Sequence, residues 1–161
     1  MPKYYIYLIY TTIFSLILIA TVPKKEIHRL AIYGIIFGGL MDVLMLIFGK
    51  ITGQFGWINY GPLGFMGIPI FADVSWAIFF IMYFYFLPKI KPFNYIFAGA
   101  GVFFSVLYTN LVIDLGIFTS NNRTWSPLIS FVVWFSIATW GYYKMNSYIE
   151  GRQVKEPTDQ C

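Results

Sequence analysis

The chain has 161 residues, of which 58% are hydrophobic, 22% aromatic and 11% charged. Soluble domains carry about 25% charged residues, so this composition excludes an ordinary soluble domain and predicts a single helical membrane domain. The net charge of +4 reflects basic residues placed beside apolar runs rather than a nucleic-acid-binding patch, and the one cysteine, Cys161, excludes an internal disulfide.

The first apolar run covers residues 4–22 and predicts a transmembrane helix that Pro23 closes. A cleaved signal peptide is the alternative, because Lys3 precedes the run and Ala20 lies where a cleavage site would fit. Three basic residues follow between positions 24 and 29, and such a flank is typical of a stop-transfer segment. We therefore expect the run to span the membrane.

The second run, residues 30–48, contains an acid, Asp42, with no cation in the same segment. A charged side chain in hydrocarbon costs about 2.5–3.5 kcal/mol on insertion scales, so Asp42 should face other helices or trapped water. Gly34 and Gly38 lie on the same predicted helical face as Asp42, which lets a neighbouring backbone come close. We expect Gly49 to end this helix.

The next stretch, residues 49–69, is rich in glycine and proline but too apolar for an ordinary loop. Two readings stay open for it. It is either an interfacial or shallow re-entrant segment, or a loop that lies on the bilayer with its aromatic residues at the headgroup level.

Three further runs predict transmembrane helices over residues 70–87, 93–118 and 128–145, so that five spans make up one bundle over residues 1–145. Ser126 and Pro127 suit the N-cap and first turn of the last helix. Residues 146–161 form a polar tail that we expect to be mobile and cytoplasmic.

Five spans divide the basic residues unevenly between the two sides of the membrane. Eight of the eleven lysines and arginines fall in the 23–29 turn, the 88–92 turn and the region from residue 144 onward. The positive-inside rule therefore predicts an external N-terminus and a cytoplasmic C-terminus.

Three acids, Asp42, Asp73 and Asp114, lie in the predicted spans, within about 10 Å of their outer ends. We expect a polar site in the outer leaflet, roofed by residues 49–69, to which Asn110 contributes and for which Lys50 and Arg123 are the candidate counter-ions. In the alternative reading Asp73 and Asp114 are solvated at the headgroup level, and Asp42 is a neutral acid hydrogen-bonded across a helix interface.

Motifs for known cofactors and catalysts are missing from the sequence, which has no Walker loop, HExxH, Gly-x-Ser-x-Gly or zinc ligand set. The sequence therefore predicts no cofactor and no metal, and it leaves open whether the protein is an enzyme. The expected surroundings are the lipid bilayer, a lipophilic ligand, and a second copy or another membrane protein, without nucleic acid.

The Met41-Asp42 helix followed by FGKITGQ, and the segment GIPIF-x-D-x-x-W-A from Gly67 to Ala77, resemble small five-span membrane proteins of Gram-positive bacteria whose function is unknown. A weaker similarity links the glycine-rich run, the proline and the tryptophan-bearing helix to membrane-bound hydratases and cyclases of carotenoid biosynthesis. That similarity implies an isoprenoid substrate, although the paired aspartate motif of membrane prenyltransferases is missing.

Three hypotheses for the function follow. The first is a small non-enzymatic membrane factor for structure, assembly or sensing, as its size and the missing catalytic motifs suggest. The second is a membrane-embedded enzyme acting on an isoprenoid or other lipophilic substrate, in which a buried aspartic acid protonates a double bond. The third is a small transporter or proton-coupled carrier that uses the acids as titrating sites and forms its pathway by oligomerising.

Overall fold

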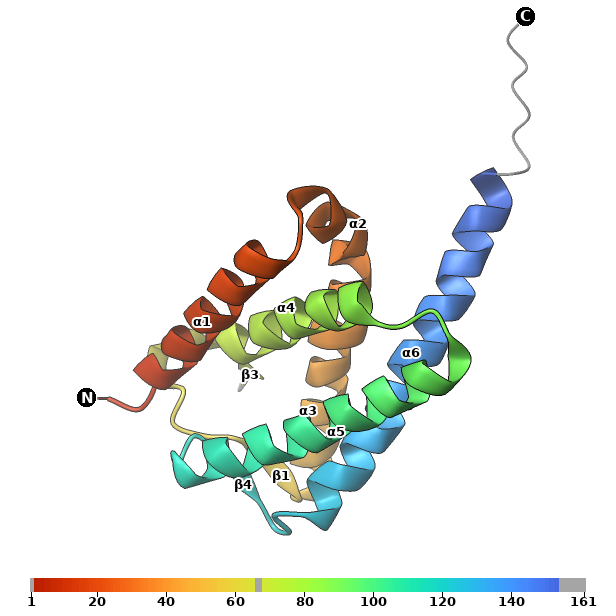
Figure 1. Cartoon of the computed structure of the whole chain (residues 1–161). Coiled ribbons are helices and arrows are strands. Elements are labelled where there is room, and N and C mark those ends of the chain that lie inside the picture. The colour runs from red at the N-terminus through yellow and green to blue at the C-terminus, as the bar shows by residue number, and fades with distance from the viewer. Residues whose placement is uncertain (1, 66–67, 154–161) are drawn as a thin grey trace, which may run out of the picture.

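The computed structural model describes residues 2–65 and 68–153, with the backbone alone for residues 149–153. The fold is mostly helical, as predicted, and contains four short strands (Figure 1). The helices are α1 (Tyr5–Thr21), α2 (Lys24–Gly34), α3 (Met41–Thr52), α4 (Ile70–Phe86), α5 (Lys91–Asp114) and α6 (Trp125–Gln153), with a π-helical segment η1 (Ile35–Leu40) and a single 3-10 turn η2 (Gly61–Leu63). The strands are β1 (Phe55–Trp57), β2 (Gly64–Phe65), β3 (Ile68–Pro69) and β4 (Phe118–Ser120).

The segments α2, η1 and α3 follow one another without a break and form a single rod from Lys24 to Thr52. The predicted end at Gly49 is wrong, because the helix continues to Thr52 and stops at Gly53, whose φ of 66° is the left-handed conformation that favours glycine. Gly49 instead allows a close approach. A Cβ at this position would lie 2.6 Å from the carbonyl oxygen of Phe55.

The π-helical segment packs directly on α4, and glycines make this possible. A Cβ on Gly34 would overlap Ile81 and the backbone of Ala77, and a Cβ on Gly38 would overlap the backbone of Trp76. The expectation that these two glycines admit a neighbouring backbone is confirmed. This contact fixes the start of α3, where Asp42 lies, against the first half of α4.

Aromatic side chains form most of the contact between α4 and α6. The rings of Trp76 and Trp134 have centroids 4.9 Å apart, those of Phe80 and Phe135 are 5.2 Å apart, and Phe84 stacks on Tyr142 at 4.6 Å. Large rings keep the helix axes apart while burying much apolar area. The heavy aromatic content of the chain is thus used to join α4 to α6.

A small β-ribbon closes one end of the helices. Strands β1 and β4 pair antiparallel, with Phe55 opposite Ser120 and Trp57 opposite Phe118, and β2 pairs with β3. Tyr7 of α1 holds the ribbon in place, since its fully buried hydroxyl lies 2.7 Å from the carbonyl oxygens of Ile58 and Ile117. The described residues between 49 and 69 thus contribute a helix end, short strands and a turn, and both readings of their position at the membrane stay predictions.

The last helix differs from its prediction at both ends. It begins at Trp125, three residues before the predicted start, and the Asn122 side chain accepts hydrogen bonds from the backbone N–H groups of Thr124 and Trp125. It continues to Gln153, so the expected mobile tail from residue 146 is helical at least that far, and residues 154–161 lie outside the described part.

Two of the helical rods in the described residues are long and apolar enough to cross a bilayer, judged by length and composition. They are Lys24–Thr52 and Lys91–Asp114, and α1 and α4 are shorter apolar helices. In Figure 1 the N-terminus and the β1–β4 ribbon lie at the lower left, whereas the α1–α2 turn, the α4–α5 turn and the end of α6 lie toward the top and right. The connections thus separate into two groups.

Candidate functional site

Two of the three predicted acids meet between α3 and α4. Asp42, in the first turn of α3, is 4% exposed, and Asp73, in the first turn of α4, is half-buried. Their carboxyl groups lie within hydrogen-bonding reach of each other. A hydrogen bond between two carboxyl groups needs a proton on one of them, so a bonded pair carries at most one negative charge.

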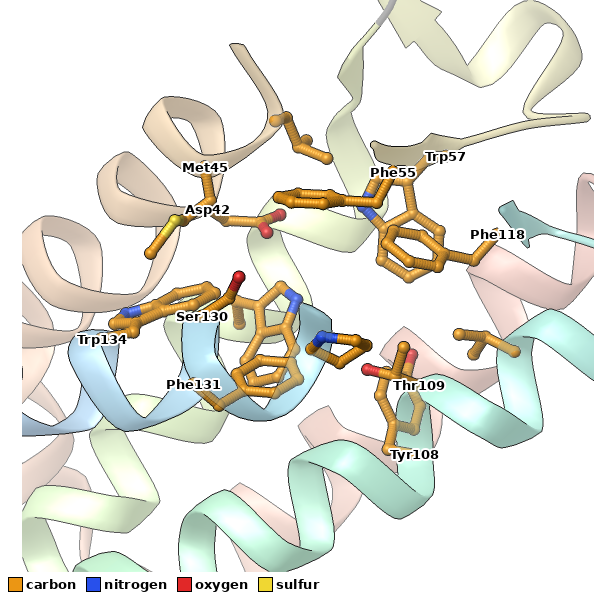
Figure 2. Close-up of a pocket in the computed structure, with 14 residues that line it drawn as sticks. Asp42, Met45, Phe55, Trp57, Tyr108, Thr109, Phe118, Ser130, Phe131 and Trp134 are labelled. Carbon is orange, nitrogen blue, oxygen red and sulfur yellow. The ribbon is translucent and has the colours of Figure 1, made fainter. Parts of the chain in front are cut away.

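A cavity of about 50 Å³ lies next to Asp42, between α3, α4, α5 and α6 and beneath the β1–β4 ribbon. Figure 2 shows the Asp42 carboxyl at its wall and the Ser130 hydroxyl directed toward that carboxyl. Seven aromatic side chains line it, namely Phe55, Trp57, Trp76, Tyr108, Phe118, Phe131 and Trp134, together with Met45, Leu46, Thr109, Val112 and Pro127.

Polar atoms in this region are left without partners. One oxygen of Asp42, one oxygen of Asp73 and the indole Nε1–H of Trp57 are buried and have no hydrogen-bond partner among the described residues. Buried polar groups in native proteins are nearly always satisfied by protein or by ordered water. An acceptor on Asp42 and a donor on Trp57 in the wall of one cavity therefore indicate a place for a bound water or for the polar group of a ligand.

Further polar side chains reach this region from α1 and α5. Tyr10 and Tyr108 approach each other with ring centroids 5.9 Å apart, and the Tyr10 hydroxyl is buried with no hydrogen-bond partner among the described residues. Thr11 is hydrogen-bonded to Ser75 at 2.7 Å and to the carbonyl oxygen of Phe71 at 3.0 Å. These bonds join α1 to α4 beside the acid pair, so they hold in place the helix that carries Asp73.

A second cavity, of about 220 Å³, adjoins the first and opens between α1, α4 and α5. Trp76 and Tyr108 line both cavities, so the two cavities lie side by side at these two residues. The other lining residues are Phe14, Ser75, Phe79, Phe104 and Ser105, and the buried hydroxyl of Ser105 has no partner among the described residues. We call this second cavity the lateral groove.

The other predicted site residues lie elsewhere. Asp114 is exposed at the end of α5 and pairs with Arg123. Asn110 donates to the carbonyl oxygen of Val106 in its own helix, at 2.9 Å. Lys50 is exposed on α3. The structure therefore brings Asp42 and Asp73 together and leaves Asp114 in an exposed ion pair with Arg123. Among the described residues, neither Asp42 nor Asp73 forms an ion pair.

The sequence interpretation missed several residues of the site, notably Tyr10, Ser130, Trp134 and the β4 residue Phe118. Ser130 and Trp134 are four apart and so share one face of α6, which was a usable signal. Phe118 carried no such signal, because its position depends on the pairing of β4 with β1 across a long sequence separation.

A metal centre does not fit these residues, since no group of three or more His, Cys, Asp or Glu in residues 2–65 and 68–153 could hold a metal ion. The chain matches no protein-family model, no curated protein and no solved structure. The function is therefore inferred from the chemistry of the site itself.

Proposed function

We propose that the chain is a multi-pass protein of the bacterial cell membrane, with five transmembrane helices, an external N-terminus and a cytoplasmic C-terminus. The exposure of its apolar helices supports this. Only 22% of the apolar stretch of α5 is buried, whereas the core helix of a soluble protein would be mostly buried. Ile19, Ile96 and Phe104 are each more than 60% exposed.

The charges and the fold are consistent with this orientation. Lys24, Lys25, Lys89 and Lys91 flank the α1–α2 and α4–α5 turns, and Lys50 and Arg123 lie at the ends of helices that lead to and from the β-ribbon. The side rich in basic residues would face the cytoplasm. The acid pair and its cavity, just beneath the ribbon, would then lie in the outer half of the membrane.

Within this protein we propose a non-enzymatic role, in sensing or assembly, that depends on binding a lipophilic ligand beside Asp42. One observation carries the proposal. Asp42 is only 4% exposed, and its carboxyl group has an unpartnered oxygen in the wall of an aromatic-lined cavity. Ligand sites are mostly apolar with a small number of polar groups that fix orientation, and acids inside a membrane are functional by default.

Native mass spectrometry of the protein released gently from membranes tests this proposal. We expect the wild-type protein and Asp114→Asn to carry the same lipophilic molecule, and Asp42→Asn to lose it while staying folded. Asp114 is a matched control, because it is an acid on the same side whose carboxylate is exposed and outside the cavity. Identical bulk lipids on all three proteins would contradict the proposal.

A second candidate is an enzyme that protonates a carbon–carbon double bond of an isoprenoid. The neighbouring acids Asp42 and Asp73 favour it, because two adjacent buried carboxyl groups retain a proton, and Asp42 lies beside aromatic rings. Transfer of that proton to an alkene carbon leaves a carboxylate and a carbocation, which ring faces stabilise. The carboxylate then takes a proton from a carbon next to the cationic centre, which restores the acid and gives an isomerised or hydrogen-exchanged alkene. A C15 polyprenyl alcohol incubated in D2O with the wild-type protein should gain carbon-bound deuterium, and it should gain none with Asp42→Asn. If the wild-type protein also incorporates no deuterium, this activity on that substrate is excluded.

A further inference from the structure

We infer that the ligand of this site is a cationic amphiphile, with an ammonium group in the cavity beside Asp42 and a hydrocarbon chain in the lateral groove. This inference rests on the proposed function and names the class of ligand for the same site. Three features of the structure support it, namely the acid pair without a counter-ion, the aromatic walls of the cavity and the groove that adjoins the cavity.

The acid pair has no counter-charge of its own among the described residues. Arg123 is occupied by Asp114, and Lys50 is exposed at the end of α3. Two neighbouring carboxyl groups carry a single negative charge when one of them is ionised, and a buried charge without a partner is costly. A monovalent cation in the adjoining cavity would remove that cost.

The walls of the cavity favour an organic cation over a metal ion. Calcium and magnesium need about six or more oxygen ligands. The side chains that line the cavity offer oxygen atoms from only four residues, Asp42, Tyr108, Thr109 and Ser130. Of these, the Thr109 hydroxyl already donates to the Ser105 carbonyl oxygen at 2.9 Å. The faces of tryptophan, tyrosine and phenylalanine rings attract ammonium groups, and cages of such rings bind methylated ammonium ligands. Seven rings surround this cavity.

The lateral groove offers a place for the rest of such a molecule. It begins at Trp76 and Tyr108, which it shares with the cavity, and it runs between apolar rings toward the outer surface of α5, where Phe104 is 63% exposed. In a membrane that surface contacts lipid chains, so the occupant of the groove is a hydrocarbon chain. The unpaired N–H of Trp57 is left for a water or for an oxygen next to the ammonium group.

Three probes with the same twelve-carbon chain test the inference in nanodiscs, namely dodecyltrimethylammonium, dodecanol and dodecyl sulfate. Binding is counted by native mass spectrometry for the wild-type protein, Asp42→Asn and Asp114→Asn. We expect the wild-type protein to bind the ammonium probe at least about tenfold more tightly than either other probe. Asp42→Asn should remove that preference and Asp114→Asn should keep it. This comparison distinguishes binding beside Asp42 from a general attraction of cations to acidic residues on the surface.

The outcomes separate the inference from the proposed function. Tighter or equal binding of dodecanol, abolished by Asp42→Asn, would overturn the cationic ligand and leave a lipophilic site at Asp42. Failure of all three probes, together with no co-purified molecule, would overturn both.

A second pair of variants keeps the test decisive if Asp42→Asn does not fold. Ser130→Lys places an ammonium group beside Asp42, and Ser130→Met is its uncharged control of similar length. The lysine variant should lose the ammonium probe far more than the methionine variant, and an equal loss in both would contradict the role of charge.

Discussion

Gly38 allows the sharpest test of how the fold positions Asp42. A Cβ at this position would overlap the carbonyl group of Trp76 and the Cα of Ala77, so Gly38→Ala requires η1 and α4 to move apart. Gly39 is the neighbouring residue on the same segment, and a Cβ there would meet its nearest atom, the Asp73 carbonyl oxygen, at an ordinary contact distance of 3.7 Å. The two substitutions therefore differ mainly in steric overlap.

The expected difference follows from two free-energy terms. Both substitutions gain up to about 1 kcal/mol of helix propensity. Gly38→Ala also incurs an overpacking cost of about 1–3 kcal/mol, because backbone atoms cannot rotate away as a side chain can. Gly38→Ala should therefore be about 1–3 kcal/mol less stable than Gly39→Ala in denaturant unfolding of the purified protein followed by tryptophan fluorescence. Equal unfolding free energies for the two variants would refute the close packing of η1 on α4.

Three further predictions concern the ribbon, the π-helical segment and the orientation. Tyr7→Phe should lower the free energy of unfolding by about 1–3 kcal/mol, because it removes the donor from two carbonyl oxygens that hold the ribbon on α1. Trp134→Phe should lower it by about 0.5–1.5 kcal/mol, because the indole N–H donates at 2.6 Å to the carbonyl oxygen of Phe37 in η1. The orientation is tested in a background in which Cys161 is replaced by serine, with a membrane-impermeant maleimide applied to intact cells. The reagent should label Thr119→Cys and should leave Lys89→Cys unlabelled until lysis. Both positions are exposed, and they lie on opposite predicted sides of the membrane.

Exposed residues of the same type serve as controls for the first two of these. Tyr95 and Trp140 are 72% and 64% exposed, so their replacement by phenylalanine should change the unfolding free energy by less than about 0.5 kcal/mol. A loss at Tyr7 or Trp134 no larger than at its control would contradict the assigned hydrogen bonds. Labelling of Lys89→Cys in intact cells, with Thr119→Cys protected, would reverse the proposed orientation.

The sequence predicted the helical class and the approximate positions of the helical rods, because long apolar runs bounded by prolines and lysines leave few alternatives. It failed at Gly49, where a glycine that admits Phe55 was read as a helix end. It also failed at residues 55–57 and 118–120, because the pairing of such short strands is set by tertiary contacts rather than by local preference. The π-helical segment has no sequence signature of its own, and it appears where glycines let α4 approach.

The candidate site was only partly predictable for a related reason. Helical spacing and depth indicated that Asp42 and Asp73 could meet, and the structure places them together. Depth alone also grouped Asp114 with them, but its carboxylate is exposed and pairs with Arg123 instead. Depth gives the position of a residue along the membrane normal and says little about its direction around the helix. The rotation of α5 was set by packing against α6, for example of Gly101 against Phe135, and this could not be read from the acids.

The central claim, that a lipophilic ligand occupies the cavity beside Asp42, is tested most directly by photo-crosslinking from inside that cavity. A diazirine amino acid placed at Ser130 faces the Asp42 carboxyl, and the same group placed at Ile129, which is 61% exposed, reports on the surrounding lipid. We predict that mass spectrometry will find one predominant lipophilic adduct at position 130, lost in Asp42→Asn, and a mixture of bulk lipids at position 129. The same mixture at both positions, unchanged by Asp42→Asn, would contradict the account.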